Sequence, residues 1–350
     1  MTAVHFILPG DPETRSGGFI YDRRVIEGLR DAGWRVETTS LPDGFPDPSP
    51  TALDAAERAL AMQPAGALIV IDGLALGVMP EVTRRHAERL HLVGLVHHPL
   101  ADETGLAADR VAALLRSERD ALQSVRRVIV TSPHTAARLA DFDVEPERIS
   151  VATPGVDEAA LAKGSGGPGL ALLCAASLTP RKGHTVLIHA LSRLADRPWH
   201  LTCAGSLTRD PVTADSVRAQ CERQRLSSRV SFPGEVKGGE LDRLYRGADL
   251  FVLASFHEGY GMVLTEALAR GLPVVATSAG AIPETLPDGT ALLVPPGDAT
   301  ALAEALRRLM DDEAALAALA RRARAARADL PRWDQTVTRF AAALRLAAAP

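Results

Sequence analysis

The sequence predicts an α/β protein built from two doubly wound, Rossmann-like domains. Short apolar runs alternate with longer helical patterns along most of the 350 residues, and this alternation is typical of βαβ units around a parallel sheet. A glycine-rich segment interrupts the pattern, which then starts again. The length is also sufficient for two cores, because single hydrophobic cores stop growing at about 250–300 residues.

The first half of the chain contains five apolar runs that are short enough to be strands. They cover residues 4–8, 67–71, 92–96, 128–131 and 149–152. Helical patterns between them cover residues 19–32, 106–124 and 133–140. Because helices alternate with strands, we expect helices on both faces of this sheet.

The segment 163–169 reads KGSGGPG and is the strongest linker signal in the chain, since glycine and proline suppress regular pairing. We place the domain boundary there, which gives an N-terminal domain of residues 1–165 and a C-terminal domain of residues 166–332. Apolar runs resume at residues 170–175, 200–204, 230–232, 250–254 and 274–277. We expect the last helix, at about 333–350, to pack back on the N-terminal domain.

Composition excludes several classes of function. The formal net charge of -4 argues against general affinity for nucleic acid, which needs a basic surface. Cys174, Cys203 and Cys221 have no metal-binding spacing and fit a reducing compartment. The start of the chain lacks the features of a signal peptide, and no 18 consecutive residues are apolar. We therefore expect a cytoplasmic protein without a transmembrane segment, while peripheral contact with a membrane stays open.

The most informative stretch is residues 256–284, which read FHEGYGMVLTEALARGLPVVATSAGAIPE. Glu258 and Glu266 are eight positions apart, with a glycine-rich turn after the first and a helical run around the second. Gly259 and Gly261 allow the backbone to pass close to a ligand, and the amides that open the helix suit a phosphate. Two carboxylates so placed can hold two polar parts of one extended ligand.

This E-x7-E pattern, within EGYGMVLTEALARGLPVVA, resembles the motif of the family 4 retaining glycosyltransferases of the GT-B fold. The resemblance covers nearly the whole chain and implies two Rossmann-like domains that face each other across a cleft. It implies transfer of a sugar from a UDP- or GDP-linked donor, bound by the C-terminal domain, to an acceptor bound by the N-terminal domain. The acceptor would be a small molecule, a glycan or a lipid. Neither a metal ion nor a cofactor beyond the nucleotide sugar is implied.

The resemblance also assigns residues to the donor. Glu258 would hold hydroxyls of the transferred sugar, and Glu266 would bind the nucleotide ribose. The diphosphate would lie at the segment formed by Gly259, Tyr260, Gly261, Met262 and Val263. The residues Gly234, Glu235 and Val236, in the stretch FPGEV, would lie beside the nucleobase.

A second candidate segment, residues 177–183, reads SLTPRKG between a predicted strand and a predicted helix. Two cations there can neutralise a diphosphate leaving group, so Arg181 and Lys182 are candidate catalytic residues. Lys182 and Gly183 match the family's Lys-Gly pair. Ser177 stands where the family usually has arginine, and Arg181 would substitute for it. A solvated basic turn stays the alternative for Arg181.

In the N-terminal domain, Gly17 and Gly18 follow the first predicted strand and resemble the glycine-rich first loop of the family, which borders the donor pyrophosphate and the acceptor. His97 and His98 end the strand predicted at 92–96, where ligands bind in open α/β sheets. The family often carries one histidine there that faces the transferred sugar. We match His98 to it, with His97 as the alternative; both could instead be bonded within a loop.

Metal chemistry has two candidate sites in the sequence, and neither is favoured. The D-x-D of Asp141 and Asp143 is a pattern used by metal-dependent transferases, but its context predicts a surface turn. The second candidate combines His97 and His98 with Asp102 or Glu103 as further ligands, but this spacing matches no standard zinc motif. Because two cations and helix amides can neutralise the diphosphate, we expect metal-independent catalysis.

Two other functions remain as alternatives. One is an epimerase or phosphorylase built on the same two-domain plan, which would need no sugar acceptor or would require inorganic phosphate. The other is a degenerate transferase that binds nucleotide sugars without catalysis. The joint presence of Lys182, Glu258 and Glu266 argues against the second, because a binding protein does not need the whole leaving-group site.

Overall fold

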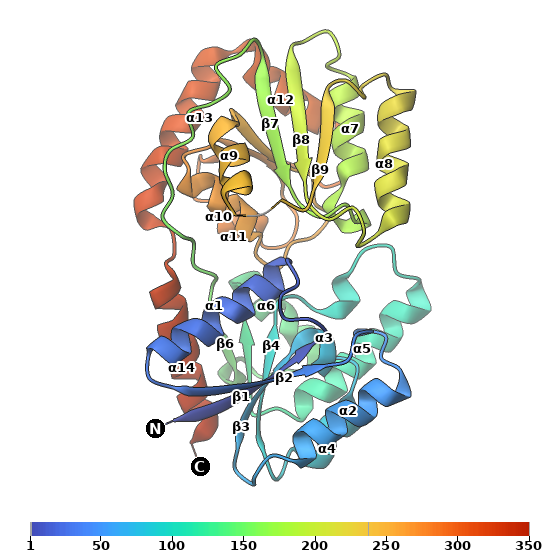
Figure 1. Cartoon of the computed structure of the whole chain (residues 1–350), viewed down its shortest axis with the longest axis vertical. Coiled ribbons are helices and arrows are strands. Elements are labelled where there is room, and N and C mark those ends of the chain that lie inside the picture. Colours follow the sequence, from blue (N-terminus) through green and yellow to red (C-terminus); the bar gives the residue numbers. More distant parts are fainter. Residues whose placement is uncertain (1, 237, 350) are drawn as a thin grey trace. The chain divides into compact units, whose positions relative to one another are not determined.

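The computed structural model describes residues 2–236 and 238–349, and its contacts divide the chain into two compact units. Unit 1 comprises residues 1–155 and 331–350, and unit 2 comprises residues 156–330. Each unit is built around its own six-stranded parallel sheet (Figure 1).

The sheet of unit 1 has the strand order β2-β1-β3-β4-β5-β6. The strands are β1 (Ala3–Pro9), β2 (Arg35–Leu41), β3 (Leu68–Asp72), β4 (His91–Val96), β5 (Arg127–Val130) and β6 (Ile149–Val151). All neighbouring pairs are parallel. The central strands β3 and β4 are almost entirely buried, as expected for strands covered on both faces.

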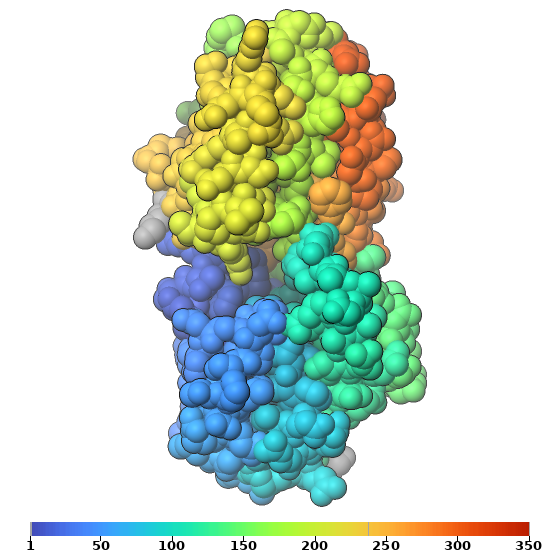
Figure 2. Space-filling view, turned by 90° about the vertical axis from the view of Figure 1, so that its right-hand side faces the viewer, coloured from blue at the N-terminus to red at the C-terminus, as the bar shows by residue number. Residues whose placement is uncertain are grey.

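Helices cover both faces of this sheet, as the alternating pattern predicts. They are α1 (Gly17–Asp31), α2 (Pro50–Ala61), α3 (Gly73–Leu76), α4 (Pro80–His86), α5 (Ala108–Gln123), α6 (Pro133–Arg138) and α14 (Trp333–Ala348). Figure 1 shows α1 and α14 on one side of the sheet and α2, α4 and α5 on the other. In the space-filling view (Figure 2), the blue-to-teal side chains of α2, α4 and α5 close over that second side.

The sheet of unit 2 has the strand order β12-β11-β10-β7-β8-β9. The strands are β7 (Leu170–Ala175), β8 (Trp199–Ala204), β9 (Val230–Gly234), β10 (Leu250–Leu253), β11 (Val274–Thr277) and β12 (Ala291–Val294). The helices are α7 (His184–Ser192), α8 (Pro211–Arg223), α9 (Gly239–Gly247), α10 (Met262–Ala269), α11 (Ile282–Thr285), α12 (Ala299–Asp311) and α13 (Glu313–Ala326). One continuous apolar core joins this sheet to its helices.

The contacts change from one unit to the other between Gly155 and Val156, ten residues before the boundary expected at 165/166. The glycine-rich segment lies against unit 2, because Ser165 donates from its backbone amide and its hydroxyl to the carboxylate of Asp249, at 3.0 and 2.7 Å. The amide of Lys163 also donates to the carbonyl of Arg246. A glycine-rich composition therefore marks a segment without regular structure here, and not the point where contacts change.

The last helix, α14, belongs to unit 1, where it packs beside α1. The ring of Phe340 stacks on that of Phe6 at 5.9 Å between centroids. The two helices approach each other closely at Gly28, because a Cβ there would lie 2.3 Å from a methyl group of Val337. The chain thus returns from unit 2 to unit 1 near Pro331.

Two strands were not predicted from the sequence, and both lie at sheet edges. β2 has only Val36 and Leu41 buried, so it has no apolar run. β12 is a short apolar run that is largely half-exposed. No helix in the described part of the chain is both long and apolar enough to cross a bilayer.

Candidate active site

The topology of unit 2 indicates where a ligand binds. The chain adds β8 and β9 on one side of β7 and β10, β11 and β12 on the other, so the strand order reverses between β7 and β10. In open parallel sheets, ligands bind outside the carboxyl ends of the strands at such a switch point. Arg181 and Lys182 follow β7, and Glu258 follows β10.

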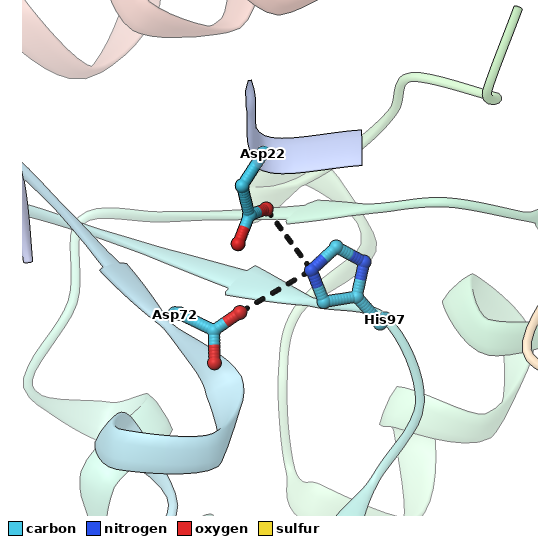
Figure 3. A group of neighbouring side chains, drawn as sticks. All are labelled: Asp22, Asp72 and His97. Carbon is cyan, nitrogen blue, oxygen red and sulfur yellow. Dashed lines mark hydrogen bonds and ion pairs between the residues drawn. The ribbon is translucent and has the colours of Figure 1, made fainter. Parts of the chain in front are cut away.

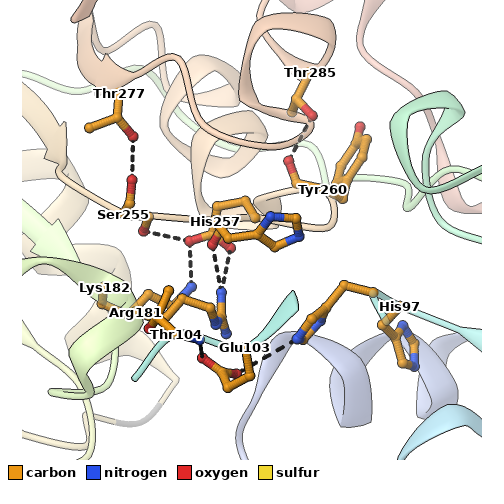
Figure 4. Close-up of polar contacts among 12 residues, drawn as sticks. His97, Glu103, Thr104, Arg181, Lys182, Ser255, His257, Tyr260, Thr277 and Thr285 are labelled. Carbon is orange, nitrogen blue, oxygen red and sulfur yellow. Dashed lines mark hydrogen bonds and ion pairs between the residues drawn. The ribbon is translucent and has the colours of Figure 1, made fainter. Parts of the chain in front are cut away.

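The structure brings these three charged side chains together at that edge, and Figure 4 labels Arg181, Lys182 and the nearby Ser255. Lys182 donates from Nζ to Oε1 of Glu258 at 2.6 Å, and Arg181 donates from Nη1 to Oε2 at 3.4 Å. The hydroxyl of Ser255 donates to Oε1 of Glu258 at 2.6 Å, and Arg181 also donates to the carbonyl of His257 at 2.8 Å. Glu258 is only 5% exposed, so it is a buried carboxylate surrounded by donors.

Two glycines let the loops that carry these residues approach each other. Gly183 has a φ of +64°, and a Cβ there would lie 2.0 Å from the carbonyl oxygen of Ala254. Gly280 has a φ of +56°, and its Cβ would lie 2.4 Å from the carbonyl oxygen of Glu258. The amide of Phe256 donates to the carbonyl of Arg181 at 2.7 Å. The loop after β7 is therefore bonded directly to the loop after β10.

The charges of the cluster determine its ionisation. Burial alone would raise the pKa of Glu258, but the positive charges of Lys182 and Arg181 outweigh burial and lower that pKa to about 2. Burial lowers the pKa of Lys182, and Glu258 opposes this change. An ionised carboxylate beside two cations is thus the stable state of the site near neutral pH.

Helix α10 begins directly after the glycine turn. Gly261 adopts a left-handed conformation with a φ of +87° at the N-cap, and the opening amides of Met262 and Val263 precede the helix's own hydrogen bonds. The amides of an N-terminal turn and the helix dipole favour an anion at this point. Tyr260 accepts a hydrogen bond from Thr285 through its carbonyl oxygen at 2.6 Å, which fixes the turn.

Glu266 lies one turn into α10 and is half-buried. The hydroxyl of Tyr245 donates to its Oε2 at 2.9 Å, and the guanidinium of Arg270 lies over the Tyr245 ring at 4.4 Å from the centroid. Burial raises the pKa of Glu266, and the hydrogen bond from Tyr245 opposes this. One oxygen of Glu266 is thus held by Tyr245, which orients the carboxylate.

The predicted nucleobase segment ends the outermost strand, β9, at the same edge of the sheet. Gly234 is left-handed, with a φ of +79°, and its carbonyl accepts from the amide of Gly205 at 2.9 Å. Glu235 is exposed, and Val236 is half-buried against the core. The segment therefore lies at the carboxyl edge of the sheet.

In unit 1, the two histidines at the end of β4 have different surroundings. His97 places Nε2 at 3.1 Å from Oδ1 of Asp22 and 3.3 Å from Oδ2 of Asp72 (Figure 3). His98 lies 3.7 Å from Oε2 of Glu103, a half-exposed loop residue. Gly18, at the start of α1, contacts the His97 ring, since a Cβ there would lie 3.2 Å from its Cδ2. Gly17 has open space beside it.

The sequence analysis did not identify Asp22. This residue lies within α1 between the buried Tyr21 and Val25 and is itself buried. A carboxylate on the apolar face of an amphipathic helix was the signal that could have identified it, since unpaired charges are rarely buried. Asp22, Asp72 and His97 are also the described residues whose ligand atoms, within 4.8 Å of one another, could hold a metal ion.

The D-x-D carboxylates are engaged elsewhere. Asp141 pairs with Arg138, and Asp143 pairs with Arg119 at 3.0 Å between Oδ2 and Nε. Both aspartates are exposed. Each carboxylate of this turn is thus already paired with an arginine.

Comparison with known proteins identifies the family. A family model described as "Glycosyl transferases group 1" matches residues 169–312, and one described as "Glycosyltransferase Family 4" matches residues 73–160. The first match contains Arg181, Lys182 and Glu258. The second contains His97 and His98.

Curated relatives agree with these models. The MMP alpha-(1->4)-mannosyltransferase of Mycolicibacterium hassiacum is 30% identical over 89% of this chain and 79% of its own length. The D-inositol 3-phosphate glycosyltransferase of Corynebacterium efficiens is 32% identical over 64% of this chain. The chain spans 58% of the length of that relative and 46% of the length of its Corynebacterium glutamicum counterpart.

Solved structures share the fold. The chain is similar to a sucrose-phosphate synthase from Thermosynechococcus elongatus, with a TM-score of 0.83, 22% identity and 99% of both chains covered. It is also similar to HepE of Anabaena in complex with UDP and glucose, with a TM-score of 0.80, 19% identity, and 98% of this chain and 99% of the other covered. The predicted fold class, GT-B with two Rossmann-like domains, is confirmed. By its two family models and its mannosyltransferase relative, the chain belongs to glycosyltransferase family 4.

Proposed function

We propose that this protein transfers a sugar from a nucleoside diphosphate sugar to an acceptor, with retention of the anomeric configuration and without a metal ion. The observation that carries this proposal is the meeting of Lys182, Arg181 and Glu258 at the switch point of unit 2. Two cations and the N-terminus of α10 follow strands whose ends lie at one edge of the sheet. Membership of family 4 supports the transferase class.

The chemistry follows from these charges. When the bond between the sugar C1 and the diphosphate oxygen breaks, its electron pair stays with the diphosphate. Lys182, Arg181 and the opening amides of α10 stabilise that negative charge. The acceptor hydroxyl bonds to C1 on the face that the diphosphate leaves, and its proton passes to the departing phosphate oxygen. No step requires an enzyme nucleophile or a divalent cation.

Glu258 has two roles in this proposal. Without a donor, it accepts hydrogen bonds from Lys182 and Ser255 and keeps both cations in place. When the diphosphate binds, its oxygens compete for Lys182, and an oxygen of Glu258 then becomes available to a hydroxyl of the transferred sugar. Without a donor, Glu258 is ionised near neutral pH, because Lys182 and Arg181 hold its pKa well below the usual value.

The remaining parts of the donor are assigned to the same edge of the sheet. Glu266, oriented by Tyr245, binds the ribose hydroxyls. The backbone of Gly234, Glu235 and Val236 lies beside the base, and unit 1 binds the acceptor. Relatives named for D-inositol 3-phosphate suggest a hydroxyl-rich acceptor.

A panel of UDP and GDP sugars tests the proposal, with UDP sugars first because the similar HepE structures are complexes with UDP. A bound donor should raise the melting temperature, since a ligand of the folded state stabilises it. Donors that stabilise the protein are then incubated with polyols, polyol phosphates and simple glycosides. Product whose anomeric proton has the donor's coupling constant is the expected result.

Three outcomes would point elsewhere. Inverted product would refute retention. An epimerised donor without acceptor, or turnover that requires inorganic phosphate, would support an epimerase or phosphorylase. A donor that binds but is transferred to no acceptor would support a binding protein. The same holds if the slow hydrolysis of the donor is equal in the wild type and in Lys182→Ala.

A further inference from the structure

Asp22 is the one residue of the apolar face of α1 that carries a charge. It is 1% exposed and lies among the buried side chains of Phe19, Tyr21, Val25 and Ile26. Burial of a carboxylate costs several kcal/mol unless the group is paired. An alanine or leucine would serve the packing of α1 better, so the carboxylate is explained by what it contacts.

Asp22 contacts His97, which is 75 residues away in the chain. The same ring nitrogen, Nε2, is shared with Asp72, the last residue of β3. Asp72 is itself fixed, because its Oδ1 accepts from the amide of Leu74 at 2.8 Å. Both carboxylates thus contact the same nitrogen, Nε2, of the His97 ring.

The location is the ligand-binding edge of unit 1. The chain places β2 on one side of β1 and β3 on the other, so the strand order reverses between β1 and β3. α1 follows β1, Asp72 ends β3, and His97 follows β4. A switch point of this kind is where open α/β sheets bind ligands.

Neighbouring residues fix the orientation of the His97 ring and of its backbone. Tyr21 contacts it edge-on at 5.4 Å between centroids, and the hydroxyl of Tyr21 donates to the carbonyl of Ala152 at 2.8 Å. Gly18 admits the ring next to α1. The carbonyl of His97 accepts from the hydroxyl of Thr131 at 3.1 Å. In Figure 3, Nδ1 lies on the far side of the ring from both carboxylates.

We propose that Asp22 is a positioning residue that, together with Asp72, holds Nε2 of His97 so that Nδ1 donates a hydrogen bond to a hydroxyl of a bound sugar. This rests on the proposed transferase function and selects His97, rather than His98, as the histidine that faces the sugar. The sugar hydroxyl belongs either to the donor or to the acceptor.

The carboxylate pair also determines the charge of the ring. Burial would lower the pKa of His97, but Asp22 and Asp72 outweigh it and raise that pKa. Burial raises the pKa of Asp22, and His97 opposes this change. Oδ2 of Asp22 is buried and has no hydrogen-bond partner in the described part of the chain. Asp22 is therefore held in a costly position whose main contact is His97.

A double-mutant cycle of Asp22→Asn, His97→Gln and the combined variant tests the proposal. Each single substitution should reduce kcat at least about 10-fold, and the combined variant should be no worse than His97→Gln, because residues that act as a unit are non-additive. Separate KM values for donor and acceptor identify which sugar is contacted. Glu27→Gln, an exposed carboxylate on the same helix, is the matched control and should turn over normally.

A second readout does not depend on transfer. In protein labelled with ¹⁵N-histidine, Asp22→Asn should lower the titration midpoint of His97 and leave the far-UV spectrum unchanged. An unaltered His97 titration overturns the positioning role, whether or not a donor has been found. A failure of the transferase function would instead appear as no binding of any nucleotide sugar, with the His97 titration still dependent on Asp22.

Two further results would contradict the proposal. Additive losses in the double variant would show that Asp22 acts on folding and not through His97. The second result is binding of zinc ion, added alone, to the wild type but not to Asp22→Asn. This would make Asp22, Asp72 and His97 a metal site.

Discussion

Nζ of Lys182 lies 2.6 Å from Oε1 of Glu258, although the two residues are 76 positions apart in the chain. The pair exists because β7 and β10 are neighbours in the sheet, so the loops that follow them meet. Gly183 and Gly280 allow the close approach of these loops. A carboxylate held between two cations is ready to exchange one of them with an incoming diphosphate.

The first prediction concerns acid stability. The pKa of Glu258 is about 2 in the folded protein, compared with an ordinary value of 4.5. The unfolded state therefore binds more protons than the folded state between these values, and stability must rise with pH in that interval. The wild type should lose about 1–3 kcal/mol of unfolding free energy through this group as pH falls from 4.5 to 2.

Glu258→Gln should lose less stability over the same interval, because the amide does not titrate. Urea unfolding of both proteins at several pH values measures the difference. Parallel curves for the two proteins would contradict an ionised, paired Glu258.

The second prediction concerns the ribose. Glu266→Ala should weaken binding of the cognate nucleoside diphosphate by about 1–3 kcal/mol, the scale of a lost hydrogen bond to a charged group. Tyr245→Phe, which removes one hydrogen bond to Glu266, should have a smaller effect in the same direction. Glu304→Ala, an exposed carboxylate on α12, is the control. Calorimetric affinities that are equal in all four proteins would remove Glu266 from the site.

The third prediction concerns metal ions. Turnover should survive exhaustive treatment with EDTA, because Lys182, Arg181 and the amides of α10 neutralise the diphosphate. Asp141→Asn and Asp143→Asn should also retain turnover, since both carboxylates pair with surface arginines. Loss of activity with EDTA and recovery with magnesium or manganese would refute metal-independent transfer.

The fourth prediction concerns α14. Phe340 is fully buried against Phe6 in unit 1, so Phe340→Ala should destabilise unit 1 by about 3–5 kcal/mol. Leu346→Ala, in the same helix but 59% exposed, should change stability by less than about 0.5 kcal/mol. Chemical denaturation of the two variants makes the comparison. Equal stabilities would mean that α14 is dispensable to the core of unit 1.

Much of the fold could be predicted because buried parallel strands are apolar throughout. The runs that became β3, β4, β10 and β11 lie in the interior of their sheets and were assigned within one residue at each end. β2 escaped prediction because it has no apolar run, and β12 escaped because its apolar run is only four residues long and largely half-exposed. The boundary near Gly155 gave no signal, since contacts and not glycine content determine where a domain ends.

The site residues that belong to short sequence motifs could be predicted from the sequence. Glu258, Glu266 and Lys182 lie in short motifs, and the structure places Lys182 beside Glu258. The meeting of Arg181 and Lys182 with Glu258 depends on strand order, which the sequence does not state. Asp22 could not be connected with His97 for the same reason, because 75 residues separate them. The roles of these residues toward a ligand stay predictions.

The most direct test of the account is a calorimetric titration of UDP and GDP into the wild type and into Lys182→Ala, with exposed Lys163→Ala as the control. The account predicts that one nucleotide binds the wild type and the control equally. Lys182→Ala should bind it about 10-fold or more weakly, because a charge-assisted hydrogen bond contributes about 1.5–3 kcal/mol. Equal affinity in Lys182→Ala, or no binding of either nucleotide to the wild type, would contradict a diphosphate site at the switch point of unit 2.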